Sequence, residues 1–519
     1  MDFEKLWNRV KFDYKKDHFL KNTTEMNLVE KDFDSWSESL ASQFEGGNYI
    51  PKSTSITDVP KSKGLIRPGV QLSVSDYTYY IHLVSQCYDK IFENLEWSQQ
   101  NKDYAYILTG NNETAVWLKN HFHGWAPFRQ KAIDFIEEGY PYVIITDITG
   151  CYENIDHQTL LSDLREIEIS QELSTKIIQA LRTWAIVTNK GIPQSCSASH
   201  ILAKVYMNPI DLALVNRGYE HIRYVDDIRI FCKTKKEAKE ALIYLTKLLR
   251  DRGLSLNSSK TGIYTADEAK EIIDGVQTTI TRIINKLKSE NSTFDFLEYF
   301  DGDYYDEDDI KELIALNENP TEDSIEVIQE TFRAFFEDSK EPFDKTLFRF
   351  LLSRLGEAEN DFAKNYCIHS IENRPEETST ILNYWKACNS YEIAINAILK
   401  YFVSKQNVYD YQNHKILDWI FDNYAKIPNE LMPFIRDFAL NGNHPEYLRI
   451  SGLRALGKYG NIADLKSIQN RYKEVNSEYE LAEIILAMKR MEVGRRNGFY
   501  KQIEEDNNWN KTAIKIAKQ

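Results

Sequence analysis

The pattern of apolar and polar positions changes about halfway along the chain. Up to about residue 265, short runs rich in β-branched residues alternate with helical stretches and with loops that contain glycine and proline, such as VPKSKGLIRPG and NKGIPQSCS. From about residue 266 onward, apolar residues recur three and four positions apart in stretches of about 8 to 15 residues, which is the period of amphipathic helices. The pattern predicts a mixed α/β region followed by an all-α region.

The helical region shows signs of repetition. Amphipathic stretches such as TLFRFLLSRL, YEIAINAILKYFVS and YELAEIILAMKRM alternate with short polar links. Pairs of these stretches recur at a spacing of roughly 35 to 45 residues, which is typical of HEAT-like repeats in a solenoid; a non-repetitive helical bundle would leave a similar pattern. We therefore expect three parts: an N-terminal segment at 1–50, an α/β region at 51–265 and an α-helical, HEAT-like domain at 266–519.

Composition and charge narrow the class of protein. A chain of 519 residues is long enough for two or more domains. The net charge is −15, and most of the acidic excess lies after residue 260, so bulk electrostatics alone would not hold long nucleic acid. Local basic grooves in the first half are compatible with this balance.

Cysteine use and hydropathy indicate the compartment. The six cysteines are widely spaced and include no CxxC pair, so we expect neither a zinc-chelating pair nor a dense disulfide framework, and a reducing cytosol fits. The first residues, MDFEKLWNRVKFDYKKDHF, contain no apolar signal-peptide core, and no run of about 18 uncharged apolar residues occurs. We expect a cytoplasmic protein without a membrane partner.

Two acidic sequences, each at the end of a predicted strand, are the main candidates for chemistry. Asp226 and Asp227 are adjacent in HIRYVDDIRIF, whose alternating apolar residues predict a hairpin, and Asp147 follows a buried β-branched run at 143–145. If these strands are neighbours, three carboxylates meet, and they cannot all stay ionised without a cation such as Mg²⁺ or Mn²⁺. Two such ions are the usual means of in-line phosphoryl transfer. Taken alone, Asp-Asp is more simply a hairpin turn.

The segments around this hairpin predict a nucleotide site. The loop GIPQSCS enters a helix with an apolar stripe, which would place Gln194 and nearby backbone amides against a nucleotide; a plain loop-to-helix junction is the alternative. After the hairpin, an amphipathic helix leads to LSLNSSKTGIY, so the order strand, helix, hairpin, helix, strand matches a split βαβ, ferredoxin-like sheet. In that layout Lys260 would lie near a triphosphate, and a surface lysine in a turn is the alternative.

Together these motifs resemble those of reverse transcriptases. Residues 51–265 look like the fingers and palm: ITDITGCY resembles motif A, GIPQSCSAS motif B, YVDD motif C and LSLNSSKTG motif D. The resemblance implies that Asp147, Asp226 and Asp227 bind two Mg²⁺ or Mn²⁺ ions, with help from the Ile148 carbonyl.

The same resemblance assigns residues that bind the nucleotide. Tyr152 takes the position of the steric gate, whose aromatic ring would clash with a 2′-hydroxyl and so favours dNTPs over rNTPs. KSKGLIRPG resembles the fingers segment that grips the triphosphate, which assigns Lys63 and Arg67. Gln194 and Lys260 complete the set.

The chain also departs from the family pattern. Ser195 replaces the glycine that usually follows GIPQ, at a point where a template or primer backbone approaches closely. After Thr261 there is no recognisable basic thumb, only the acidic helical region, whose charge has the wrong sign for gripping a duplex. No zinc-finger, endonuclease or RNase H pattern follows.

This combination resembles the bacterial abortive-infection (Abi) reverse transcriptases, which defend against phage, and most closely the branch carried by P2-type prophages. The resemblance implies DNA synthesis without a template, primed on a tyrosine hydroxyl of the protein itself, in a cyclic homo-oligomer. The partners would be dNTPs, a single-stranded DNA product attached to the protein, and a phage or host trigger protein. Among 31 tyrosines, Tyr14 is the first hypothesis for the priming residue and Tyr49 the second.

Two other functions compete with this one. A templated RNA-directed DNA polymerase of the retron or group II type is disfavoured by the missing thumb. A catalytically vestigial scaffold, whose helical region binds a phage or host partner, is disfavoured by the intact aspartates and by Gln194 and Lys260.

Overall fold

The computed structural model describes residues 2–16, 20, 23–119, 122–273, 322–337 and 343–519. These residues form two compact units, and each unit is assembled from three separate segments of the chain. The first unit comprises Met1–Phe19, Ala41–Thr54 and Val70–Asp303, and the second comprises Leu20–Leu40, Ser55–Gly69 and Tyr304–Gln519. The boundaries at 50 and 265 inferred from the sequence stay a prediction.

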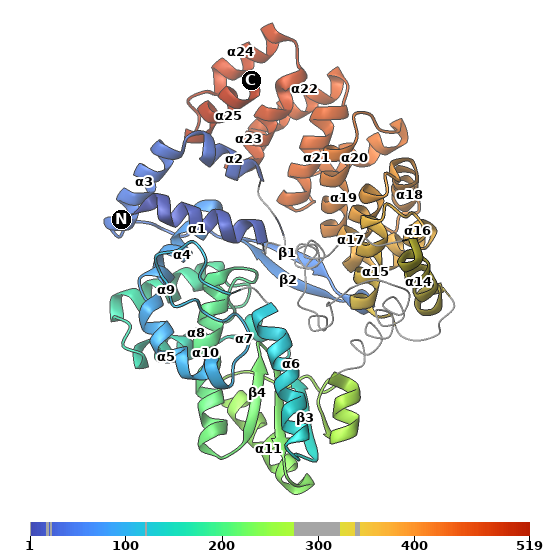
Figure 1. The fold of residues 1–519 in the computed structure, drawn as a ribbon. Coiled ribbons are helices and arrows are strands. Elements are labelled where there is room, and N and C mark those ends of the chain that lie inside the picture. Colours follow the sequence, from blue (N-terminus) through green and yellow to red (C-terminus); the bar gives the residue numbers. More distant parts are fainter. Residues whose placement is uncertain (1, 17–19, 21–22, 120–121, 274–321, 338–342) are drawn as a thin grey trace. The chain divides into compact units, whose positions relative to one another are not determined.

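A four-stranded antiparallel sheet is the centre of the first unit. Its strands lie in the order β4-β5-β3-β6. Along the chain they are β3 (Tyr142–Asp147), β4 (Glu220–Tyr224), β5 (Asp227–Cys232) and β6 (Gly262–Thr265). Helices separate β3 from the β4–β5 hairpin, and one helix separates the hairpin from β6, which confirms the predicted split βαβ order. Figure 1 labels β3 and β4 of this sheet beside α6 and α11.

Helices surround this sheet, and three of them pack directly on its strands. α6 contacts β4 and β5, α10 contacts β4, and α11 contacts β3, β5 and β6. The helices of the first unit are α1 (Phe3–Lys16), α4 (Val74–Ser85), α5 (Tyr88–Asn101), α6 (Phe122–Glu137), α7 (Cys151–Asn154), α8 (His157–Glu166), α9 (Gln171–Trp184), α10 (Ser197–Asn216) and α11 (Lys235–Asp251).

The sequence of α11 explains why it forms where it does. Thr234 caps its N-terminus by accepting a hydrogen bond from the Glu237 amide, and Gly253 follows its C-terminus with φ +76°, a conformation that glycine adopts without strain. Its apolar stripe is buried against the sheet, as predicted: Ala238, Ala241, Leu245 and Leu249.

The second unit joins N-terminal segments to the C-terminal helices. The hairpin of β1 (Ser55–Pro60) and β2 (Ile66–Gln71) contacts α19 through β1, and α2 (Thr23–Lys31) contacts α23 and α25. Thr24 donates a hydrogen bond to Glu483, and Tyr479 donates one to Glu25 at 2.6 Å. α3 (Phe33–Glu45) follows α2. The second unit therefore contains segments from both ends of the chain.

The C-terminal helices alternate between two series of neighbours. One series is α15 (Lys345–Glu357), α17 (Thr378–Ala387), α19 (Asp410–Asn423), α21 (Glu446–Tyr459), α23 (Glu478–Ala487) and α25 (Asn508–Lys518), and each member packs on the next. The others are α14 (Glu322–Phe332), α16 (Lys364–Asn373), α18 (Tyr391–Val403), α20 (Met432–Leu440), α22 (Ile462–Arg471) and α24 (Val493–Ile503), with α16 on α18 and α20 on α22. The predicted helical character of this region is confirmed for its described residues.

Arginine side chains connect successive helices of this region. Arg349 pairs with Glu377 at 2.8 Å, and Arg449 forms a fork with Glu480, whose carboxylate is fully buried. Within the described ranges, no helix combines the length and apolarity needed to cross a membrane.

A close approach between α20 and α21 offers a test of this packing. A Cβ added at Gly452 would lie 2.6 Å from the Ala439 nitrogen, so Gly452→Ala must push two backbones apart. We expect the free energy of unfolding to fall by about 2 kcal/mol in urea titrations. Gly498→Ala is the matched control, because nothing lies within 4 Å of its added Cβ and alanine favours the helix by up to about 1 kcal/mol. Equal stability of the two variants would contradict the packing.

Candidate active site

The sheet brings the predicted acidic residues to one end of neighbouring strands. Asp147 ends β3 and is the register partner of Asp227, which begins β5. Directly opposed residues in an antiparallel pair have Cα atoms about 5 Å apart and side chains on the same face. The carbonyl of Asp226 accepts a hydrogen bond from the Ile148 amide at 3.1 Å, so the turn is tied to the segment after β3.

The turn that carries Asp226 has a strained backbone. Tyr224 and Asp227 are register partners, which leaves a two-residue loop of Val225 and Asp226 between β4 and β5. Val225 has φ +53°. A positive φ suits the first position of such a hairpin loop, but it is unfavourable for a β-branched side chain. Strain of this kind persists only where the surrounding structure holds it.

Electrostatics at this end of the sheet are dominated by negative charge. Desolvation, followed by repulsion from Asp226, raises the pKa of Asp227 to about 8. Asp147 adds to this shift, whereas the cations Arg229 and Lys260 oppose it. The carboxylate cluster therefore retains a proton near neutrality, which is the condition that a bound divalent cation relieves.

The segment between α11 and β6 anchors Asp147. The Asn257 side chain donates to Asp147 Oδ2 at 3.1 Å, and the Asn257 amide donates to the Asp147 carbonyl at 2.8 Å. Lys260 Nζ lies 3.6 Å from the same Oδ2, with 54% of its side chain exposed. Sequence reasoning selected Lys260 and missed Asn257; the available signal was that both lie in LSLNSSKTG.

The carboxylates fit divalent ions in chemistry but do not present a finished ligand set. Aspartate oxygens are the donors that Mg²⁺ and Mn²⁺ prefer, and the raised pKa of Asp227 shows uncompensated charge. However, no group of three or more His, Cys, Asp or Glu side chains among the described residues is close enough to hold a metal ion. Asp147 directs one oxygen at Asn257 and Lys260 instead.

Tyr152, in the segment that follows β3, packs against His200 on α10. The hydroxyl of Tyr152 on α7 is 2.6 Å from His200 Nδ1, and the two rings meet edge to face. Tyr106 stacks on the His200 ring at a centroid distance of 3.6 Å, so His200 lies between Tyr106 and Tyr152. The tyrosine predicted as the steric gate is therefore fixed by α10.

The loop before α10 places Gln194 near the same helix. Gln194 donates to Glu153 on α7 at 3.3 Å. Ser195 has φ +60°, the left-handed conformation that glycine favours. The serine thus keeps the backbone conformation expected of the residue that it replaces.

Lys63 and Arg67 belong to the other unit. Lys63 lies between β1 and β2, is exposed and has φ +63°, and Arg67 lies half-buried on β2. Both residues fall within Ser55–Gly69, whereas the three aspartates lie in the first unit. Their role with the triphosphate stays a prediction.

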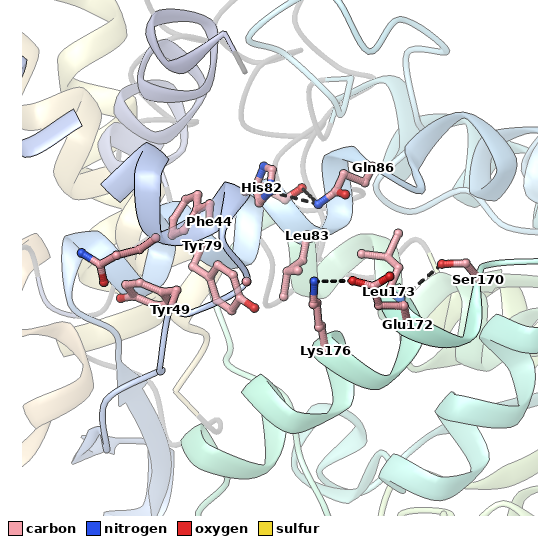
Figure 2. Close-up of a pocket in the computed structure, with 12 residues that line it drawn as sticks. Phe44, Tyr49, Tyr79, His82, Leu83, Gln86, Ser170, Glu172, Leu173 and Lys176 are labelled. Atoms are coloured by element: carbon pink, nitrogen blue, oxygen red, sulfur yellow. Dashed lines mark hydrogen bonds and ion pairs between the residues drawn. The ribbon is translucent and has the colours of Figure 1, made fainter. Parts of the chain in front are cut away.

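The two tyrosines predicted for priming differ in environment. Tyr14 on α1 is only 6% exposed and packs edge to face on Tyr77. Tyr49 is half-buried, and its hydroxyl donates to Asp76 Oδ1 at 3.0 Å. Tyr49 lines a cavity of about 210 Å³. Figure 2 shows it with Phe44, Tyr79, His82 and Lys176, which line the same cavity.

The cavity beside Tyr49 is aromatic on one side and charged on the other. Phe44 contacts Tyr49 edge to face, and Tyr79 lies 4.6 Å from Tyr49 between ring centroids. Lys176 pairs with Glu172 one turn away on α9, at 2.7 Å, and both line the cavity (Figure 2). Burial, with the nearby Lys176, lowers the pKa of His82 to about 4, so this imidazole is neutral at physiological pH.

Comparison with known proteins identifies the domain that carries the aspartates. Residues 59–299 match the family described as "Reverse transcriptase (RNA-dependent DNA polymerase)". The chain carries a reverse transcriptase domain. This domain family is a nucleotidyltransferase family of the DNA polymerase type. No curated protein matches the chain.

Solved structures similar to this chain include telomerases of Candida. Apo telomerase from Candida tropicalis, truncated from its C-terminal domain, is 13% identical with a TM-score of 0.31 and covers 41% of this chain. This chain spans 50% of the length of that one. Apo telomerase from the same species is 12% identical over 92% of this chain and 74% of its own, with a TM-score of 0.31. Telomerase from Candida albicans, in complex with a fragment of telomeric RNA, is 11% identical over 75% of this chain and 66% of its own, with a TM-score of 0.32. Similarity this low carries no argument about function.

The charge at Asp227 predicts an unusual pH dependence of stability. Its pKa of about 8 in the folded protein exceeds the ordinary value of 3.8, so the folded state binds more protons between these values and loses stability as pH rises. In chelator, the Tm should fall from pH 5 to pH 9, and Asp227→Asn should flatten this fall and melt higher than wild type at pH 9. Asp251→Asn, at an exposed carboxylate, is the control and should keep the wild-type slope. Parallel slopes for wild type and Asp227→Asn would contradict the assignment.

Proposed function

We propose that the protein is a divalent-metal-dependent DNA polymerase that joins dNTPs to a tyrosine hydroxyl of its own chain without a template. The observation that carries the polymerase reaction is the pairing of Asp147 with Asp227 beside Asp226, inside a reverse transcriptase domain. The role in bacterial abortive infection, in the cytoplasm, rests on the resemblance of the whole sequence to the Abi branch.

The three aspartates and the Ile148 carbonyl would hold two Mg²⁺ or Mn²⁺ ions. When bound, the ions supply charge neutralisation and activation of the attacking hydroxyl in phosphoryl transfer. The surrounding residues orient these ligands: Asn257 holds Asp147, and the Ile148 amide holds the Asp226 carbonyl.

The remaining predicted residues would bind the dNTP. Lys260 is half-exposed beside Asp147, where an ammonium group can assist the departing pyrophosphate. Tyr152, fixed by its hydrogen bond to His200, would act as the steric gate against a 2′-hydroxyl. Gln194 would support the nucleotide from the loop before α10, and Lys63 and Arg67 would contact its triphosphate.

Tyr49 is the better supported of the two priming hypotheses. A priming hydroxyl must reach a dNTP and lose its proton, and Tyr49 is half-buried at a cavity with its hydroxyl on the Asp76 carboxylate. A carboxylate in this position can accept the proton. Tyr14 lacks comparable access because its side chain is 6% exposed.

The helical unit would provide surfaces for contacts with other molecules. Each helix from α15 to α25 in the first series packs on the next, which supports a degenerate HEAT-like arrangement. Such a surface suits contacts in a cyclic homo-oligomer, with the single-stranded product, or with a phage or host trigger protein. The absence of a basic thumb in the sequence agrees with priming on protein, since no duplex then has to be gripped.

A templated RNA-directed DNA polymerase is the second candidate. It is favoured by the description of the matching family, which is RNA-dependent DNA polymerase. The two candidates differ in whether added nucleic acid is required.

An assay without nucleic acid separates the candidates. Purified protein with Mg²⁺ and labelled dNTPs should acquire label that stays with the polypeptide on a denaturing gel and disappears after protease treatment. Asp227→Asn should reduce this label at least about 100-fold, because the charge of the transition state loses a partner. Asp251→Asn, at an exposed site, should retain wild-type labelling. A strict need for added template would establish the second candidate instead.

Substitution of the two tyrosines tests the priming site. Tyr49→Phe should reduce protein-linked label at least about tenfold while extension of an added DNA primer continues, because only the attacking hydroxyl is lost. Tyr14→Phe should retain the label. Peptide mapping of the DNA-linked protein identifies the attachment residue directly, and attachment at any residue other than Tyr49 would refute the assignment.

A further inference from the structure

A buried cluster of charged side chains lies next to the turn of Val225 and Asp226 between β4 and β5. Arg223, near the end of β4, forms a fork on Asp211, with Nε at 3.1 Å and Nη2 at 2.7 Å from the carboxylate. The same Nη2 lies 2.8 Å from Asp103, which also accepts from Lys204 at 2.6 Å. All four side chains are at most 4% exposed. Two cations and two anions thus balance one another away from water.

Arg223 also reaches the strained turn itself. Its Nη1 donates to the Val225 carbonyl at 3.1 Å, and Val225 is the residue with φ +53°. The Arg223 backbone is held as well, because its amide donates to the Lys102 carbonyl and its carbonyl accepts from the Tyr104 amide. The guanidinium therefore links β4, which is hydrogen-bonded to the 102–104 segment, to the peptide that precedes Asp226.

A guanidinium is the group that can make these contacts together. Its planar fork donates in several fixed directions, so it can meet Asp211, Asp103 and the Val225 carbonyl at the same time. An ammonium at the same place lacks this geometry. Buried ion pairs add little net stability, because desolvation offsets their attraction, so the contribution of this cluster lies in geometry.

We propose that Arg223 is a positioning residue for metal binding. It fixes the left-handed peptide of Val225 and thereby sets the directions in which Asp226 and Asp227 present their carboxylates to a divalent ion. The inference rests on the proposed function, because it assumes that these aspartates bind the metal.

The test replaces Arg223 with lysine, which keeps the charge and removes the fork. Without substrate, Mg²⁺ should raise the Tm of wild type, and Arg223→Lys should need about tenfold more Mg²⁺ for half of this rise. In the polymerase assay the Mg²⁺ midpoint should shift by the same factor, and the KM for dNTP at saturating Mg²⁺ should change less than twofold.

Arg9→Lys is the matched control. Arg9 is 2% exposed and donates from Nη2 to the carbonyls of Asn112 and Thr114, so its substitution also removes a buried guanidinium and its hydrogen bonds from this unit. It should lower the Tm without moving either Mg²⁺ midpoint. If Arg223→Lys behaves in the same way, Arg223 is merely structural and the inference fails.

The strained turn provides an independent readout. Glycine adopts a positive φ without strain, so Val225→Gly should make the turn less dependent on the guanidinium. In the double variant the Mg²⁺ midpoint should return to within about threefold of Val225→Gly alone, whereas additive effects would overturn the inference.

Two further outcomes are distinguishable. If Arg223→Lys does not fold, Asp211→Asn keeps the arginine and its Asp103 partner; it should shift the Mg²⁺ midpoint at least threefold, and an unchanged midpoint overturns the inference. If wild type itself shows neither a Tm response to Mg²⁺ nor Mg²⁺-dependent labelling, the proposed function fails, and the inference falls with it.

Discussion

Repulsion between carboxylates is the constraint on which the first unit depends. The register of β3 and β5 places Asp147 opposite Asp227, and the turn adds Asp226 beside them. Burial and mutual repulsion raise the pKa of Asp227 to about 8, and Lys260 and Arg229 offset this only in part. An arrangement that costs free energy in the absence of a cation is suited to binding one, and the same charge can be used to stabilise phosphoryl transfer.

The groups behind the carboxylates explain how such an arrangement stays in place. The acidic end of the sheet is supported by Asn257 on one side and by a buried, charge-balanced cluster around Arg223 on the other. The strained conformation of Val225 lies between them. A turn that is unfavourable by itself persists because hydrogen bonds from rigid elements hold it, which is the usual origin of preorganised ligands.

The second unit is stabilised in a different way. Its helices are held by repeated pairing of each helix with the next, and arginine forks such as Arg449 with Glu480 connect successive helices. α2 and the β1–β2 hairpin belong to this unit although they precede the four-stranded sheet of the first unit in the chain. Removal of the N-terminal segment would therefore also remove contacts of α23 and α25.

Local sequence determined the elements, the motif order and the identity of the acidic residues. A continuous β-branched run predicts β3, a two-residue period predicts the β4–β5 hairpin and a period near 3.6 predicts α11, so all of them could be predicted from neighbours along the chain. The register of Asp147 opposite Asp227 agrees with that order, which is typical of the split βαβ pattern.

Tertiary structure alone decided the contacts between distant segments. Two contacts leave no periodic signal, Asn257 on Asp147 and Arg223 between Asp103 and Asp211, because each joins side chains from different elements. The same holds for the division into units, which follows from packing and not from chain order. Periodicity reports which face of an element is buried, whereas the partner that buries it is selected only when the whole chain folds.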